Sequence, residues 1–274
     1  MGNRCRFMLA VICLGTGLLL VLPLVCRAGQ SPEHDPAYAA RKAELVSRFG
    51  QAVPRQWGET VTGVKTRLDT SEPVIALTLD ACGSQQGMGF DAGLLAFLER
   101  EQVPATLFIN VRWIGPNRQA FDRLAANPLF EIANHGQQHK PASVTGRSVY
   151  GLDGTRNVAE LIDEIELGAA KIAALTGRRP RFYRSGTAYY DEVAVQVAEA
   201  LGQQVAGFSV LGDKGATYGR DEVKAALLSA RPGDIVILHM NHPESGTRAG
   251  VMAAIPELMR RGFSFVRLSE QPLR

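Results

Sequence analysis

Cysteine is nearly absent from the main part of this 274-residue chain. Cys5, Cys13 and Cys26 all lie within residues 1–28, so only Cys82 remains in the rest of the protein. A single cysteine cannot form an internal disulfide. Because 46% of the residues are apolar and 21% are charged, we expect core packing alone to hold a globular domain together.

A surplus of positive charge is also missing from the main part of the chain. The formal charge of +3 comes from Arg4, Arg6 and Arg27, and the remainder has as many basic as acidic residues. A neutral domain argues against nucleic acid as a partner, since nucleic-acid binding requires a basic surface. There is no G-x-G-x-x-G or P-loop motif, and residues 207–211 fail the G-x-S-x-G pattern at their last position. Nucleotide chemistry and a serine nucleophile of that type are therefore not expected.

The N-terminus has the pattern of an export segment. Residues 1–6 are basic, residues 7–25 carry no charge, and residues 26–28 resemble a cleavage site. We predict a signal peptide over residues 1–28, with two alternatives: a membrane tether through residues 7–25, or lipidation at Cys26. Each version places the rest of the chain in the periplasm or outside the cell. Residues 29–70 are expected to form a linker and N-terminal extension before a domain over residues 71–274.

From residue 73 onward, short apolar runs alternate with amphipathic segments. Strands are predicted at 74–79, 105–110, 130–133, 182–183, 205–210, 235–238 and 263–268. Helices are predicted at 37–49, 90–101, 119–126, 157–175, 192–201, 222–229 and 252–261. This alternation indicates an α/β fold with a parallel sheet and crossover helices, and we favour a distorted (β/α) barrel of about seven units.

Chemically active side chains follow the predicted strands at their carboxyl ends, where the active sites of β/α barrels lie. They are Asp80, His135, His139, Arg184, Asp213 and His239. A lone histidine or aspartate at such a position is usually structural. Five strand ends that supply such groups together favour an active site over coincidence.

His135 and His139 are four residues apart, a spacing that brings two imidazoles together on one helical turn. Two neighbouring imidazoles can share a metal ion, and zinc suits such ligands. The alternative is one capping histidine and one surface histidine.

These segments together resemble the polysaccharide deacetylases, the NodB-homology group also called carbohydrate esterase family 4. The resemblance spans residues 73–268. It rests on Leu77-Thr78-Leu79-Asp80-Ala81, Asn134-His135-Gly136-Gln137-Gln138-His139, Tyr183-Arg184-Ser185-Gly186-Thr187, Gly212-Asp213 and Leu238-His239, which stand in the family's order.

The resemblance implies a metal-assisted removal of acetyl groups from a glycan, within a distorted barrel. His135 and His139 would then hold a divalent metal, which we expect to be zinc. Asp80 would act as the general base, Arg184 would orient it, and His239 would be the general acid. Asp213 would tune His239. The resemblance also implies that a backbone N–H near Thr187 donates to the oxyanion of the substrate. The family's aromatic residue at this position is lost, and Tyr189 and Tyr190 nearby either line the substrate groove or only pack.

The sequence departs from the family at one metal ligand, because Ala81 stands where the family's second aspartate is expected. Three outcomes remain open. Asp80 itself could bind the metal. Cys82 could replace the aspartate, since a two-residue period places it on the same side of the strand as Asp80 and thiolate binds zinc well. Otherwise the metal is weakly bound or absent.

The leading hypothesis is an exported, metal-dependent deacetylase acting on the amide of a polysaccharide or peptidoglycan. Ala81 motivates a second hypothesis, a non-catalytic glycan-binding protein of the same fold. A third is hydrolysis of a small amide or an O-acetyl ester at the same site.

Overall fold

The computed structural model describes residues 35–274 of the chain. The predicted export segment, with its cleavage, tether and lipidation alternatives, lies outside the described residues. No helix within residues 35–274 is both long enough and apolar enough to cross a bilayer. The predicted export and the predicted domain boundaries therefore stay predictions.

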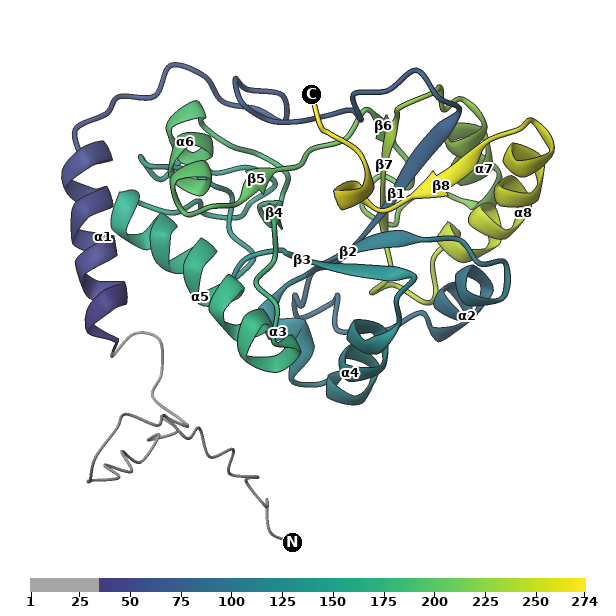
Figure 1. The fold of residues 1–274 in the computed structure, drawn as a ribbon, viewed down its shortest axis with the longest axis horizontal. Coiled ribbons are helices and arrows are strands. Elements are labelled where there is room, and N and C mark those ends of the chain that lie inside the picture. Colours follow the sequence, from purple (N-terminus) through teal and green to yellow (C-terminus); the bar gives the residue numbers. More distant parts are fainter. Residues whose placement is uncertain (1–34) are drawn as a thin grey trace, which may run out of the picture. The chain divides into compact units, whose positions relative to one another are not determined.

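Eight strands form a single sheet in which every paired neighbour is parallel (Figure 1). The order along the sheet is β5-β4-β3-β2-β1-β7-β6. The short strand β8 pairs with the first three residues of β1. β5 and β6 do not pair with each other in the described part of the chain, so the barrel is curled and open. The predicted distorted (β/α) barrel is confirmed. The strands are β1 Val74–Ala81, β2 Ala105–Ile109, β3 Phe130–Asn134, β4 Phe182–Tyr183, β5 Gln204–Val205, β6 Val210–Leu211, β7 Ile235–His239 and β8 Ser264–Val266.

Helices surround the sheet on its outer side (Figure 1). α7 packs against α8, α2 also contacts α8, and α1 lies against α5 and α6. The α-helices are α1 Pro36–Phe49, α2 Ala92–Arg100, α3 Val111–Ile114, α4 Arg118–Ala126, α5 Val158–Thr176, α6 Glu192–Ala200, α7 Arg220–Leu228 and α8 Thr247–Arg260. A short 3-10 helix, Leu268–Glu270, follows β8.

Side chains of the central strand β1 alternate between the apolar core on one face of the sheet and the candidate site on the other. Leu77, Leu79 and Ala81 join the apolar cluster shared with the outer helices. Thr78 and Asp80 point to the opposite face, into the barrel, where both accept hydrogen bonds from the same buried arginine. Successive strand residues face opposite sides, so alternate positions of β1 serve packing and chemistry.

The predicted strand over residues 205–210 was wrong in its extent. The structure has two short strands there, β5 and β6, separated by residues 206–209. The carbonyls of Ala206 and Gly207 accept hydrogen bonds from the side chain of Arg184. On the other side of this segment, the backbone of Lys65 pairs with that of Ala206 in an isolated bridge. An arginine side chain thus occupies acceptors that a continuous strand would use.

Helix α8 begins at Thr247, five residues before the predicted start. Gly250, in its first turns, approaches α7 so closely that a Cβ there would lie 2.4 Å from the Cβ of Val223. The glycine that weakens the helix signal in the sequence is the residue that lets the two helices pack.

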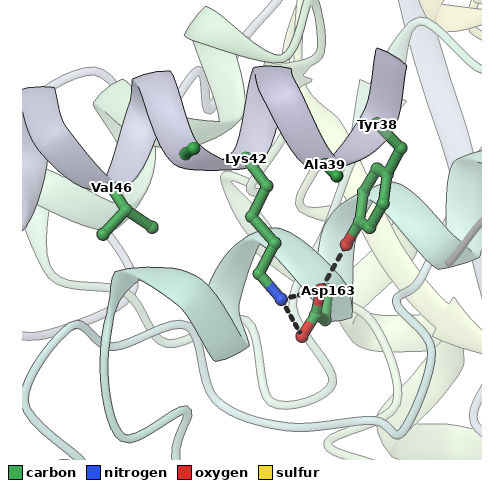
Figure 2. Close-up of a pocket in the computed structure, with 6 residues that line it drawn as sticks. Tyr38, Ala39, Lys42, Val46 and Asp163 are labelled. Carbon is green, nitrogen blue, oxygen red and sulfur yellow. Dashed lines mark hydrogen bonds and ion pairs between the residues drawn. The ribbon is translucent and has the colours of Figure 1, made fainter. Parts of the chain in front are cut away.

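Helix α1 begins at Pro36, one residue before the predicted start, with Asp35 as its N-cap. On its face toward α5, Lys42 pairs with both carboxylate oxygens of Asp163 at 2.6 Å, and the Tyr38 hydroxyl donates to the same carboxylate (Figure 2). The shallow pocket that they line with Val46 contains none of the predicted site residues. These contacts attach the N-terminal extension to the barrel.

Candidate active site

A fully buried guanidinium lies at the centre of the site. Arg184, which follows β4, donates to the Asp80 carboxylate at 2.8 Å and to the Thr78 hydroxyl at 2.9 Å. It also donates to the carbonyls of Ala206 at 3.0 Å and Gly207 at 2.8 Å. Its guanidinium carbon lies 4.1 Å from the centroid of the Phe108 ring.

Asp80 and His135 meet at the ends of β1 and β3. The side chain of Asp80 is 3% exposed, and its second carboxylate oxygen lies 3.7 Å from Nε2 of His135. His135 Nδ1 is 3.0 Å from the carbonyl oxygen of Arg184, which can only accept, so Nδ1 carries a proton. Nε2 therefore faces the interior of the site and has a lone pair available whenever the ring is neutral.

Cys82, His135 and His139 form a candidate metal-binding cluster. Their ligand atoms all lie within 4.8 Å of one another. Ligand atoms around a tetrahedral zinc lie roughly 3.3–3.8 Å apart, so the set would have to draw together by up to about 1 Å to enclose an ion. Nε2 of His139 is buried and has no hydrogen-bond partner in the described structure. An unpartnered buried nitrogen facing a thiol and an imidazole fits a metal ligand, and the set of donor atoms suits zinc.

The charges of this cluster perturb its ionisable groups. Burial raises the pKa of the Cys82 thiol, but the charge of His139 and the nearby rings of His135, His139 and His239 lower it by more, so the net pKa lies well below its usual range. Burial lowers the pKa of His135, yet the charge of Asp80 and contact with Cys82 raise it overall. A thiolate beside imidazoles is the form that binds a metal.

The loop from His135 to His139 is held by two residues that sequence analysis missed. The side-chain amide of Asn110 donates to the carbonyls of His135 and Gly136 at 2.8 and 2.9 Å. The buried carboxylate of Glu164 accepts from the backbone N–H groups of Gln138 and Lys140. Burial raises the pKa of Glu164 to about 7 despite these donors. An available signal was the position of Glu164, on the same face of its helix as apolar residues.

His239 and Asp213 form a charged pair on the other side of the site. Nδ1 of His239 lies 2.8 Å from one oxygen of Asp213, and the other oxygen accepts from the His239 backbone N–H and the Thr247 hydroxyl. Burial lowers the pKa of His239, but the Asp213 charge and hydrogen bond raise it well above its ordinary value. Burial raises the pKa of Asp213, but the charge of His239 and the hydrogen bond with it lower this pKa overall. The pair therefore favours an imidazolium.

The three residues predicted to contact substrate differ in their exposure. Thr187 and Tyr189 are half-buried on the loop after Arg184. Tyr190 has no exposed surface, and its hydroxyl accepts from the backbone N–H of Ser185 at 3.2 Å. The prediction of a substrate contact for Tyr190 is therefore corrected: its side chain packs beneath the loop and supports it.

Comparisons with known proteins identify the family. The model of the polysaccharide deacetylase family matches residues 67–206, just over half of the chain, so the chain belongs to this family. A chitooligosaccharide deacetylase from Sinorhizobium fredii is 29% identical over 209 residues, which are 72% of this chain and 91% of that protein. Family membership supports a hydrolase that acts on carbon–nitrogen bonds.

Solved structures share the fold. A peptidoglycan N-acetylglucosamine deacetylase superimposes with a TM-score of 0.64 at 20% identity, over 77% of this chain and 92% of that one. A pseudoenzyme of carbohydrate esterase family 4 from Bacillus anthracis gives a TM-score of 0.60 at 20% identity, over 75% of this chain and 67% of that one. One fold thus carries both active and inactive sites, so activity must be argued from the residues.

Replacing Arg184 by lysine tests the central position of the guanidinium. An ammonium group cannot reach four acceptors in a fixed plane, so carbonyls and a carboxylate would lose buried partners. We expect the Arg184→Lys variant to lose about 3 kcal/mol of unfolding free energy, measured by chemical denaturation. The same substitution at the exposed Arg181, three residues away, serves as the control and should cost less than about 0.5 kcal/mol. Equal losses in the two variants would contradict this account of Arg184.

Proposed function

We propose that this protein is an exported, metal-dependent deacetylase that hydrolyses the acetamide of N-acetylated sugars in a glycan. The observation that supports it most strongly is the convergence of three groups at one end of the barrel. These groups are a carboxylate fixed by a guanidinium, a thiol with two imidazoles, and an imidazole charged by a buried aspartate. Amide hydrolysis needs a proton acceptor, an electrophilic centre and a proton donor.

Asp80 is suited to accept the proton of the attacking water. One of its oxygens is held by Arg184, and the other faces the candidate metal ligands. His239 is suited to donate a proton to the leaving nitrogen because Asp213 favours its charged form. The side chain of His239 is 13% exposed, so it can reach a substrate from the edge of the site. No covalent intermediate is required.

Cys82, His135 and His139 would hold the metal, which we propose to be zinc. When bound there, zinc polarises the acetyl carbonyl and lowers the pKa of water. Cys82 is a better third ligand than Asp80, because Asp80 is already engaged by Arg184 and does not belong to the cluster of ligand atoms within 4.8 Å. A thiolate also favours zinc over magnesium or calcium, which prefer oxygen ligands.

A second candidate is a glycan-binding protein without catalysis. It is favoured by Ala81, which removes the family's expected carboxylate ligand. It predicts purified protein without stoichiometric metal, and glycan binding that does not depend on metal. Hydrolysis of a small amide or an O-acetyl ester is the third alternative, and a panel of acetylated substrates separates it from glycan deacetylation.

Acetate release provides the direct test. Protein purified without its first 28 residues and loaded with zinc should release acetate from chitooligosaccharides or peptidoglycan. A chelator should abolish the reaction because water and carbonyl lose their activation, and added zinc should restore it. The measurement is enzymatic quantification of acetate over time. Glycan binding with no acetate released under any divalent metal would reject the proposal in favour of the second candidate.

Variants at Cys82 test the third ligand. We expect Cys82→Ala to lower zinc affinity at least about a hundredfold, because removing a ligand costs more than removing a residue that only supports one. Cys82→Asp restores an oxygen ligand and should retain metal. His242→Ala, at a histidine outside the cluster, is the control and should bind zinc as the wild type does. Zinc content by elemental analysis and competition with a chromogenic chelator measure these effects. Unchanged affinity in Cys82→Ala would exclude the thiol as a ligand.

The pair of His239 and Asp213 predicts a pH dependence. A general acid must be protonated, so kcat/KM should fall as the pH rises through the raised pKa of His239. Asp213→Asn removes the charge that raises this pKa, and the alkaline limb should move to lower pH by about 1–3 units. The exposed Asp221, changed to asparagine, is the matched control. An alkaline limb that stays in place in Asp213→Asn would show that His239 is not the acid.

A further inference from the structure

Three aromatic rings from separate parts of the chain gather outside the catalytic groups. The centroid of the Tyr189 ring lies 5.8 Å from that of Trp57 and 5.5 Å from that of Tyr150. Trp57 belongs to the N-terminal extension, Tyr150 to the loop between β3 and α5, and Tyr189 to the loop after β4. We call Trp57, Tyr150 and Tyr189 the aromatic platform. Neither Trp57 nor Tyr150 belongs to the motifs that identify the family.

Tyr150 is held in an unusual conformation. It stands at the tip of a two-residue hairpin turn, where Val149 and Leu152 exchange backbone hydrogen bonds of 2.9 and 3.1 Å. Its φ is +54° and that of Gly151 is +75°, as in a type I′ turn. Asparagine is favoured at this position and a bulky aromatic residue is rare. The ring is nonetheless 71% exposed, so packing in the core does not explain it.

The N-terminal extension is fixed beside the same loop. Gly58 and Tyr190 exchange backbone hydrogen bonds of 3.0 and 3.1 Å next to Trp57 and Tyr189. The carboxylate of Glu192 accepts from two further backbone N–H groups just before Trp57. The relative position of the Trp57 and Tyr189 rings is therefore built into the backbone.

The platform lies close to the candidate metal cluster. Gly186 packs so tightly on the backbone of His139 that a Cβ there would lie 2.3 Å from the His139 carbonyl. Tyr189 follows three residues later, a distance of at most about 11 Å even for extended chain. A linear glycan of a few sugars can therefore reach the platform while one of its sugars occupies the catalytic groups.

We propose that the aromatic platform binds a second pyranose ring of the same glycan, a short way along the chain from the sugar that is deacetylated. The inference rests on the proposed function and adds a subsite that favours oligomers over single sugars. A pyranose offers an apolar face of C–H groups, which packs on an exposed aromatic ring, and hydroxyls at its rim, which need polar partners. An exposed aromatic surface beside a catalytic site is typical of a ligand-binding groove.

Polar groups border the platform. The guanidinium of the exposed Arg147 lies 5.2 Å from the centroid of Trp57, so it covers that ring and leaves Tyr150 as the open surface. Glu59 lies near enough for its charge to act on the Tyr150 hydroxyl, at the border of the platform. Arg147 can donate to sugar hydroxyls and Glu59 can accept from them.

Replacing Tyr150 by asparagine removes the ring while relieving its backbone conformation. The probe is chitotetraose, with N-acetylglucosamine as the short comparison. Binding is followed by the fluorescence of Trp57, since the other tryptophan, Trp113, is fully buried. A chelator is present so that no turnover occurs. We expect Tyr150→Asn to bind chitotetraose about tenfold more weakly, with no change for the monomer.

Tyr150→Phe, which keeps the ring, is the matched control and should bind within about twofold of the wild type. The melting temperature of Tyr150→Asn should equal or exceed that of the wild type, which shows that the fold is intact. Chitotetraose binding that is absent in the wild type, or unchanged in Tyr150→Asn, would overturn the subsite. Acetate release from chitotetraose, measured separately on zinc-loaded protein without chelator, distinguishes the two proposals. Weakened binding in Tyr150→Asn together with no acetate release by the wild type leaves the platform as a glycan-binding site and rejects the deacetylase.

Discussion

The site is organised around one constraint, the fully buried positive charge of Arg184. The guanidinium of Arg184 must find acceptors for its donors, because an uncompensated buried charge would cost several kcal/mol. It finds them on β1, in Thr78 and Asp80, and on the chain after β5. The carbonyl of the same arginine fixes the tautomer of His135. One residue thus ties together three parts of the sheet and orients both the proposed base and a proposed metal ligand.

The choice of Cys82 as the proposed third metal ligand follows from the pleat of β1. Ala81 faces the apolar cluster under the outer helices, whereas Asp80 and Cys82 lie on the side of the imidazoles. With this strand geometry a carboxylate at position 81 would be buried among apolar side chains without a partner, which is unfavourable. A thiol one residue later reaches the same centre. The chain thus lacks the family's carboxylate at position 81 but has a thiol at position 82 that is available as a ligand in its place.

The sequence predicted what depends on periodicity and failed where tertiary contacts decide. Asp80 and His239 were found because apolar strands end at them. The place of Glu164 on the apolar face of its helix signals that it is buried, but its partners in the loop of His139 depend on how that helix packs, which the local pattern does not record. The sequence could not tell Tyr189 from Tyr190, because nothing in the residues after a short strand signals which of two neighbours faces solvent. In the structure Tyr190 is buried and Tyr189 is partly exposed. Trp57 lies in a segment without regular structure, and only its backbone pairing with the loop after β4 explains its position.

Backbone strain gathers around the same end of the barrel. Six non-glycine residues in the described part of the chain have positive φ, and five of them follow a site residue on its loop. They are His139, Tyr150, Ala188, Lys214 and Ala216. Such conformations each cost free energy and persist only where the surroundings determine them. At His139 the surroundings include the buried carboxylate of Glu164, which accepts from the backbone N–H groups of the residues on either side. Rigid strands and buried charges hold the loops in geometries that their own sequences would not choose, and these loops carry both the candidate metal ligands and the aromatic platform.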